Sequence, residues 1–265
     1  MRPNQVKRDL RAGQVCLGTW LSLGNLLAAR YMARVGFRWL TLDLEHGPWD
    51  WESACHAMAT IADTGCVPLV RVPANRHEYI KRALDLGAHG VVVPMVNSVE
   101  EAKAAVAATK YPPQGVRSVG GNVHALNFGT NASQYLNHAN EEILVVLQCE
   151  HITAVQNADA IFSVPGIDAI FCGPNDLAWS MRQVPGMAPK AEAILQAQKQ
   201  ILAACQKHRI PAGIHCFSAE EAYRRSQEGW QFLAINSDLR FLLDGAVAAL
   251  KPFRTGMTAA EAGEY

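Results

Sequence analysis

The chain has 265 residues, of which 49% are hydrophobic and 18% charged, and its formal net charge is zero. A neutral chain with scattered basic residues offers no electrostatic footprint for nucleic acid, and no apolar run approaches the ~20 residues that span a membrane. Seven cysteines without a Cys-x-x-Cys pair, and an N-terminus without the apolar region of a signal peptide, predict a cytoplasmic protein with buried thiols.

One unit recurs along the chain: a short apolar run, a turn, and then an amphipathic helical pattern. The predicted strands are Val15–Leu21, Trp39–Leu44, Val67–Val70, Gly90–Val93, Leu144–Cys149, Asp168–Phe171, Ala212–His215 and Phe232–Ile235. Helical patterns lie between most of them, at Asn25–Val35, His77–Leu86, Val99–Thr109, Glu192–Lys207 and Ala219–Glu228. Several helices are followed by a glycine, such as Gly87 or Gly229, which adopts the left-handed conformation that ends a helix.

Eight strands alternating with helices over ~250 residues predict a (β/α)₈ TIM barrel. No linker divides the chain, so we expect a single barrel domain over residues 1–253 and a C-terminal tail over 254–265. The Gly- and Asn-rich segment Tyr111–Asn140 is predicted to be a loop. A doubly wound open sheet is the alternative, but no G-x-G-x-x-G motif follows the first strand.

Polar residues follow the predicted strands at the ends where the active site of such a barrel lies. They are Glu45, His46, Arg71, Gln148, Glu150, Asn175, Asp176, His215, Asn236, Ser237 and Asp238. Two buried-strand patterns run straight into the carboxylates of Glu150 and Asp176, although an unpaired charge near a core costs several kcal/mol. Side by side, these two ends would make an oxygen-rich pocket for a hard cation such as Mg²⁺ or Mn²⁺.

Each of these residues also has a purely structural interpretation. Gln148 and Glu150 share one face of a strand; if that face points outward, Glu150 caps the following helix. Asp176 is an equally good helix N-cap. His46 could be a structural histidine or a base oriented by a carboxylate, and Arg71 an ordinary ion pair or a clamp for a substrate carboxylate or enolate.

Two further observations limit the chemistry. His215 and Cys216 look like metal ligands, but a thiol suits a hard cation poorly, so we predict a supporting or packing role for both. All the lysines fall in helical or terminal patterns, and none follows a strand. If the chain acts on carbonyl compounds, a metal rather than an imine must therefore stabilise the developing enolate.

Several motifs together resemble the HpcH/HpaI aldolases, which are metal-dependent (class II) pyruvate aldolases. They are Leu42-Asp-Leu-Glu-His-Gly-Pro, Val70-Arg-Val-Pro, Leu84-Asp-Leu-Gly-Ala, Val92-Val-Pro-Met-Val, Tyr111-Pro-Pro-Gln-Gly-Val-Arg, Leu147-Gln-Cys-Glu and Phe171-Cys-Gly-Pro-Asn-Asp-Leu. The resemblance spans roughly residues 5–250, and its motifs are specific in combination. It implies a carbon–carbon lyase of aromatic or sugar-acid catabolism that forms homohexamers.

The resemblance also implies a role for each matching residue. His46 would be the general base, with Asp85 raising its basicity, and Arg71 would stabilise the enolate. Glu150 and Asp176 would bind a divalent metal, either Mg²⁺, Mn²⁺ or Co²⁺. Two residues would contact the keto acid beside Asp176: Gln148 through its side chain and Asn175 through its backbone N–H.

The predicted reaction is the cleavage or formation of a 4-hydroxy-2-oxo acid from pyruvate, or a related keto acid, and an aldehyde. The loop at 115–130 departs from the family pattern, and we expect it to shape the aldehyde side of the pocket. The alternatives are a citrate-synthase-like or decarboxylating enzyme of the same family, or a non-catalytic barrel that binds keto acids.

Overall fold

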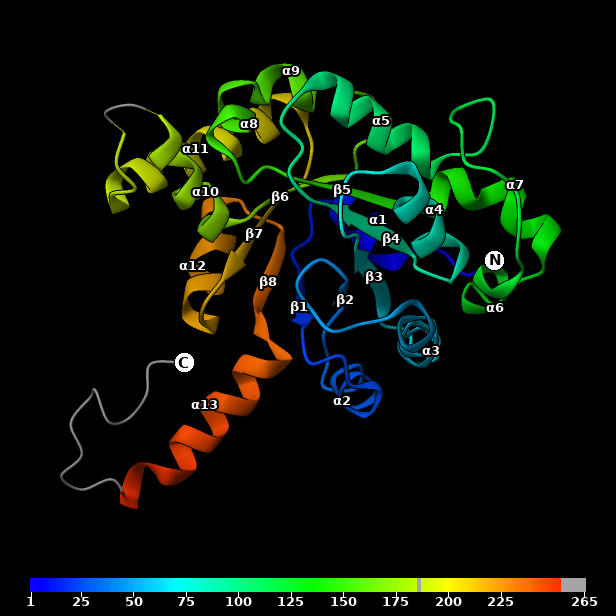
Figure 1. Cartoon of the computed structure of the whole chain (residues 1–265), viewed down its shortest axis with the longest axis horizontal. Helices are drawn as coiled ribbons and strands as arrows, with labels where there is room; N and C mark the ends of the chain where they lie inside the picture. The colour runs from blue at the N-terminus through cyan, green and yellow to red at the C-terminus, as the bar shows by residue number, and fades with distance from the viewer. Residues whose placement is uncertain (185–186, 254–265) are drawn as a thin grey trace.

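A closed barrel of eight parallel strands forms the centre of the computed structural model, which describes residues 1–184 and 187–253 (Figure 1). The strands are β1 (Cys16–Leu21), β2 (Trp39–Asp43), β3 (Val67–Arg71), β4 (Gly90–Val93), β5 (Leu144–Gln148), β6 (Ala169–Cys172), β7 (Ala212–Cys216) and β8 (Phe232–Ser237). Each strand pairs in parallel with the next, and β1 also pairs with β8. The predicted TIM barrel is confirmed, and the open sheet is excluded. The predicted tail, 254–265, lies outside the described residues.

Helices surround this barrel, and most of them follow a strand. They are α1 (Gln5–Arg11), α2 (Leu26–Met32), α3 (Trp51–Ala62), α4 (His77–Asp85), α5 (Val99–Thr109), α6 (Val123–Asn127), α7 (Ala132–Glu142), α8 (Ile152–Gln156), α9 (Ala158–Phe162), α10 (Pro174–Ser180), α11 (Ala191–His208), α12 (Ala219–Glu228) and α13 (Asp238–Leu250). Two short 3₁₀ helices, Met181–Gln183 and Lys251–Phe253, follow α10 and α13. Gly229 ends α12 with a φ of 104°, as its sequence position predicts.

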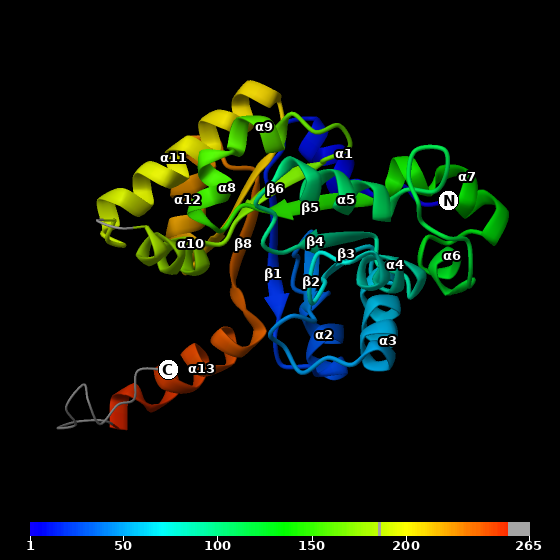
Figure 2. The same cartoon turned by 45° about the horizontal axis from the view of Figure 1, so that its top comes forward.

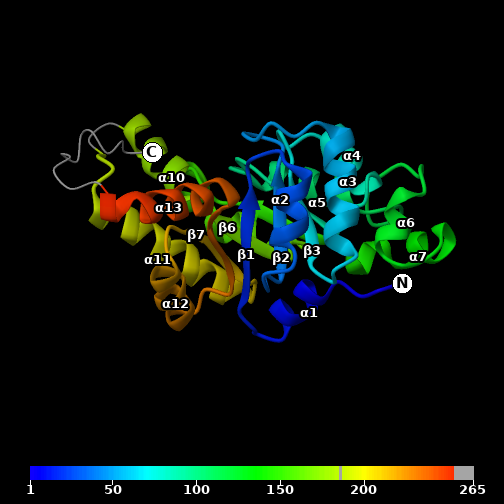
Figure 3. The ribbon, with the colours of Figure 1, turned by 90° about the horizontal axis from the view of Figure 1, so that it is seen from below.

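Two apolar cores hold the fold together. One lies inside the barrel, where Trp39 stacks on Phe232 and Phe171 meets Trp20 edge to face. The helix α1 adds Val6 to this inner core and lies at the amino ends of the strands, as Figure 3 shows for β1. The other core fills the space between strands and outer helices. The amino end of the barrel is therefore closed, and the carboxyl end is the one available for a site.

The segment Tyr111–Asn140 is not the loop that its composition predicts, because it contains α6 and most of α7. Asn131 caps α7 by accepting a hydrogen bond from the backbone N–H of Gln134. Tyr135 and Ala139, four residues apart, are buried on one face of the helix. Here Gly and Asn lie at the ends of short helices, as Asn131 does at the start of α7. The sequence prediction of a loop was wrong on this point.

The last helix, α13, leads away from the barrel at the carboxyl end of β8 (Figures 1 and 2). Of its residues, only Asp238 is buried, and it anchors the helix by accepting hydrogen bonds from the backbone N–H groups of Ser22 and Leu23. Leu242, Val247 and other apolar side chains of α13 are exposed. Among the described residues, no helix is long and apolar enough to cross a membrane.

Candidate active site

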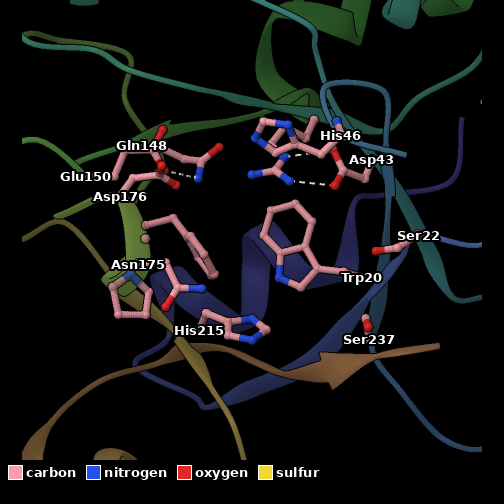
Figure 4. Close-up of a pocket in the computed structure, with 14 residues that line it drawn as sticks. Trp20, Ser22, Asp43, His46, Gln148, Glu150, Asn175, Asp176, His215 and Ser237 are labelled. Atoms are coloured by element: carbon pink, nitrogen blue, oxygen red, sulfur yellow. Dashed lines mark hydrogen bonds and ion pairs between the residues drawn. The ribbon is translucent and has the colours of Figure 1, made fainter. Parts of the chain in front are cut away.

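A cavity of about 260 Å³ opens at the carboxyl ends of the strands, the position that a TIM-barrel active site occupies (Figure 4). Its volume lies just below the ~300 Å³ at which ordinary small-molecule sites begin, which suits a very small substrate. The cavity is lined by Trp20, Ser22, Asp43, His46, Arg71, Gln148, Glu150, Phe171, Gly173, Pro174, Asn175, Asp176, His215 and Ser237. Of the residues with a predicted catalytic, substrate-binding or metal-binding role, it brings together His46, Arg71, Gln148, Glu150, Asn175 and Asp176, but not Asp85.

Glu150 is buried against the cavity wall, with only 3% of its surface exposed. One carboxylate oxygen accepts the backbone N–H of Met95 at 2.9 Å, and the other accepts the Gln148 side-chain amide at 2.6 Å. Burial, together with the negative charge of Asp176, raises the pKa of Glu150 to about 7. Glu150 does not cap α8, because His151 is the capping residue there. Its burial therefore serves the cavity.

Asp176 reaches the same wall from the first turn of α10. It is not the N-cap of that helix, because Gly173 occupies the cap position and Pro174 begins the helix. A Cβ at Gly173 would lie 2.4 Å from a carboxylate oxygen of Glu150. Only glycine therefore lets the backbone of this turn approach Glu150 so closely, and the approach sets the two carboxylates side by side, as Figure 4 shows.

Arg71 forms the other charged wall, through a forked ion pair with Asp43. These two residues are register partners in neighbouring strands, and the guanidinium donates to the carboxylate at 2.9 and 2.5 Å. Burial opposes ionisation of Asp43, but the Arg71 hydrogen bonds outweigh it and hold the pKa of Asp43 below its usual value. The guanidinium also lies 4.6 Å from the Trp20 ring centroid. Arg71 is thus fixed in one orientation.

His46 projects into the cavity mouth across from the carboxylates (Figure 4), and its side chain is 65% exposed. Its backbone N–H donates to Asp43 at 3.1 Å, and its imidazole Nε2 lies 3.8 Å from a Glu45 oxygen. The carboxylate beside this histidine is therefore Glu45, which the sequence analysis placed at the rim without a role.

Within one chain Asp85 does not reach His46, and its predicted effect on the basicity of His46 stays a prediction. Asp85 ends α4, which runs back toward the amino ends of the strands, and it pairs with Arg117 at 2.7 Å. The loop at 115–130, expected to shape the aldehyde side, contributes no residue to the cavity either. The motifs identify residues that the family shares, but only the fold shows which of those residues are in contact within one chain.

The residues present suit a hard divalent cation. The side-chain oxygen Oε1 of Gln148 is buried and has no hydrogen-bond partner among the described residues. Burial opposes the charge of Glu150, and the nearby carboxylate of Asp176 adds to that effect, so the pKa of Glu150 is raised. Within the described residues, no group of three or more His, Cys, Asp or Glu side chains is arranged to hold a metal. Two carboxylates completed by water and substrate oxygens are the arrangement typical of Mg²⁺.

Sequence reasoning missed several lining residues, of which Asp43 and Trp20 contact Arg71, and it gave His215 only a supporting role. Asp43 and Trp20 had no assigned role, although Asp43 lies two residues before Glu45 on the same strand end and could have been noticed there. His215 was predicted to pack or support, but its ring lines the cavity next to Asn175 (Figure 4). None of the lysines in the described part of the chain lines the cavity.

Fold and cavity together define a class: a TIM-barrel enzyme whose acidic, lysine-free site suits small anionic substrates. A model of the HpcH/HpaI aldolase/citrate lyase family matches residues 17–244, and the chain belongs to that family. This membership confirms the predicted enzyme class, a carbon–carbon lyase of the pyruvate aldolase type.

Curated relatives and solved structures agree with this assignment. The chain is 37% identical to a 5-keto-4-deoxy-D-glucarate aldolase of Klebsiella pneumoniae over 89% of this chain and 91% of that protein. It is 36% identical to a hydroxypyruvate/pyruvate aldolase of Cupriavidus necator over 95% of this chain and 93% of the relative. A crystal structure of a family member from Burkholderia cenocepacia superposes with a TM-score of 0.87 at 32% identity, covering 95% of this chain and all of that one.

Proposed function

We propose that this protein is a divalent-metal-dependent aldolase that cleaves 4-hydroxy-2-oxo acids to pyruvate and an aldehyde, and joins the two in reverse. The observation that carries the proposal is the pair of carboxylates, Glu150 and Asp176, facing the fixed guanidinium of Arg71 across one small cavity. The relatives named above act on a keto-deoxy sugar acid or on pyruvate and hydroxypyruvate. We therefore place the substrate among sugar-acid derivatives and the reaction in sugar-acid catabolism.

Glu150 and Asp176 would hold Mg²⁺, Mn²⁺ or Co²⁺, and the unpartnered Gln148 oxygen faces the same space. When bound, such a cation polarises the 2-keto oxygen and stabilises the charge that develops on it. The backbone N–H of Asn175, in the first turn of α10, is the proposed partner of the keto-acid carboxylate, because N–H groups at a helix start have no partner within the helix.

His46 would take the proton from the C4 hydroxyl as the C3–C4 bond breaks. Its exposed position at the cavity mouth allows it to meet the aldehyde end of the substrate while Arg71 stays deeper, at the keto-acid end. Asp43 holds the Arg71 guanidinium at two points, so the donor is already oriented when charge develops on the enolate oxygen. Preorganised donors of this kind stabilise a transition state without the cost of reorientation.

We also propose that the enzyme works as a homo-oligomer, with a hexamer as the predicted state, in the cytoplasm. The support is the projection of α13 from the barrel with exposed apolar side chains such as Leu239, Leu242 and Leu250. A second copy is the natural cover for such a helix. Asp85 could act on His46 only from another copy, so its assigned role depends on this assembly.

The test is the exchange of the methyl protons of pyruvate with D₂O, followed by proton NMR. The enzyme loaded with Mg²⁺ or Mn²⁺ should catalyse exchange, EDTA should abolish it, and added metal should restore it. Exchange that survives exhaustive chelation, or a covalent adduct trapped by borohydride, would contradict the proposal.

A further inference from the structure

A second cavity, of about 450 Å³, adjoins the proposed catalytic one. It is lined by His215, Phe217, Asn236, Ser237 and Arg240, so His215 and Ser237 belong to both cavities. In the proposed reaction, pyruvate would occupy the part of the first cavity beside Glu150 and Asp176. The shared residues form the junction between the two spaces, so the second cavity offers room for the part of a longer substrate that lies beyond the C4 hydroxyl.

The imidazole of His215 is a polar group without a partner at this junction. Neither ring nitrogen has a hydrogen-bond partner among the described residues, and the ring's aromatic contact is with Phe217, edge to face at 4.9 Å. Burial lowers the pKa of His215 to about 4, so the ring is neutral near pH 7. A neutral imidazole presents one N–H donor and one acceptor nitrogen, which is the complement of a hydroxyl group.

A β-bulge turns Ser237 toward the same junction. Gly18 of β1 pairs with Ala234 of β8, but Trp20 pairs with Ser237, so β8 carries one extra residue between these pairs. Asn236 absorbs the bulge with a φ of 51°, and the Thr19 hydroxyl donates to its carbonyl at 3.2 Å. Bulges and left-handed residues of this kind often re-aim a side chain beside an active site.

Ser237 retains hydrogen-bonding capacity although it caps α13. Its oxygen accepts the backbone N–H of Arg240 at 3.2 Å, and its own O–H remains available to donate. The junction thus offers two uncharged partners, an imidazole and a hydroxyl, on the wall away from Glu150 and Asp176 (Figure 4).

We infer that His215 and Ser237 form a subsite that recognises a hydroxyl group on the aldehyde, so that the enzyme selects hydroxylated over plain aliphatic aldehydes. This inference rests on the proposed aldolase function and specifies its acceptor class. An apolar junction would instead leave the hydroxyl of such an aldehyde unpaired, at the cost of a buried polar group.

The test compares glycolaldehyde with acetaldehyde as acceptors, with pyruvate as donor and saturating Mn²⁺. The two aldehydes differ by one hydroxyl group. The wild-type protein should favour glycolaldehyde in kcat/KM, and His215→Leu should reduce that ratio about 10-fold, mainly through KM for glycolaldehyde, as the loss of one hydrogen bond predicts. His215→Asn, which keeps a neutral donor and acceptor, should restore part of the preference.

The matched control is His138→Leu, the same substitution at an exposed histidine that lines neither cavity, and it should leave the ratio unchanged. An unchanged ratio in His215→Leu would overturn the subsite. So would a change that appears only when hydroxypyruvate replaces pyruvate as donor, because the recognised hydroxyl would then belong to the donor. Absence of metal-dependent pyruvate exchange in the wild-type protein contradicts the aldolase proposal itself, and so distinguishes that failure from a failure of the subsite.

Discussion

Buried charges lie at both ends of this barrel, but they are arranged in opposite ways. At the amino end, Lys7 is 3% exposed and pairs with Asp168 at 2.8 Å, while its ammonium also donates to the Ile143 carbonyl at 2.7 Å. Asp168 in turn accepts the backbone N–H of Val145 at 3.0 Å and pairs with Arg11 at 3.2 Å. Each strong donor there has an acceptor within the chain.

At the carboxyl end, the carboxylates of Glu150 and Asp176 face each other, and the Gln148 oxygen is unpartnered. The pKa of Glu150 rises to about 7, because burial opposes its charge. One end of the barrel therefore satisfies its charges internally, and the other leaves binding capacity for a ligand. A buried charge alone therefore does not identify a binding site. Here the site is indicated by a buried carboxylate with a raised pKa and a buried side-chain oxygen that has no hydrogen-bond partner among the described residues.

The largest expected effect comes from removing a charge at the carboxyl end. Glu150→Gln should lower kcat about 10³-fold, since a metal ligand accounts for several kcal/mol of charge stabilisation in the transition state. The melting temperature of the metal-free protein should stay level or rise, because the disfavoured carboxylate is gone. Steady-state kinetics and thermal unfolding check both expectations; activity within tenfold of the wild type would contradict the ligand assignment.

The matching change at the amino end should act on stability instead. Asp168→Asn leaves the Lys7 ammonium buried without its closest counter-charge, and breaking such a pair costs about 3 kcal/mol in the free energy of unfolding. Urea unfolding measures the loss, and the folded variant should keep wild-type kinetics. The double variant Lys7→Met/Asp168→Asn should recover part of the stability; if it is no more stable than the single variant, the charge argument does not hold.

Arg71→Lys tests whether the active site needs the forked geometry of the guanidinium or only its positive charge. Lysine keeps the charge but cannot reproduce the two-point contact with Asp43, so the donor loses its fixed orientation. We expect kcat to fall about 10²-fold, the size of the loss of one oxyanion donor, with a smaller rise in KM for the keto acid. A change in KM alone would make Arg71 a carboxylate clamp rather than an enolate stabiliser.

The smallest effect is a pH dependence of stability at the amino end. Burial lowers the pKa of His89 to about 3, whereas in the unfolded chain it titrates near 6.5. Between pH 6.5 and 3 the unfolded state therefore binds the additional proton, and stability falls as the pH falls. From pH 7 to 5, His89→Gln should lose about 2 kcal/mol less than the wild-type protein. Parallel losses in both proteins would contradict this assignment.

The sequence predicted the barrel well because its signals are local and repeated. Apolar runs of fixed length alternate with helical patterns, and the glycine after α12 marks a helix end. The carboxyl-end rim also followed from the fold rule, and it correctly brought Glu150, Asp176, Arg71 and His46 to one cavity.

What the sequence left open depended on contacts between distant segments. Asp85 has a family motif around it, but only the direction of α4 shows that it meets Arg117, and not His46, within one chain. The junction at His215 needed a bulge in β8 that no local pattern signals. The ion pair of Lys7 could not be predicted for the same reason, because its partner Asp168 lies far along the chain.

The central claim is that the carboxyl end, and not the amino end, has room for one cation between Glu150 and Asp176. The most direct test is calorimetric titration of the metal-free protein with Mn²⁺, in the wild type, in Asp176→Asn and in Asp168→Asn. The account predicts one Mn²⁺ per chain in the wild type and in Asp168→Asn, tightened by pyruvate, and loss of that binding in Asp176→Asn. Equal Mn²⁺ affinity in all three proteins would contradict it.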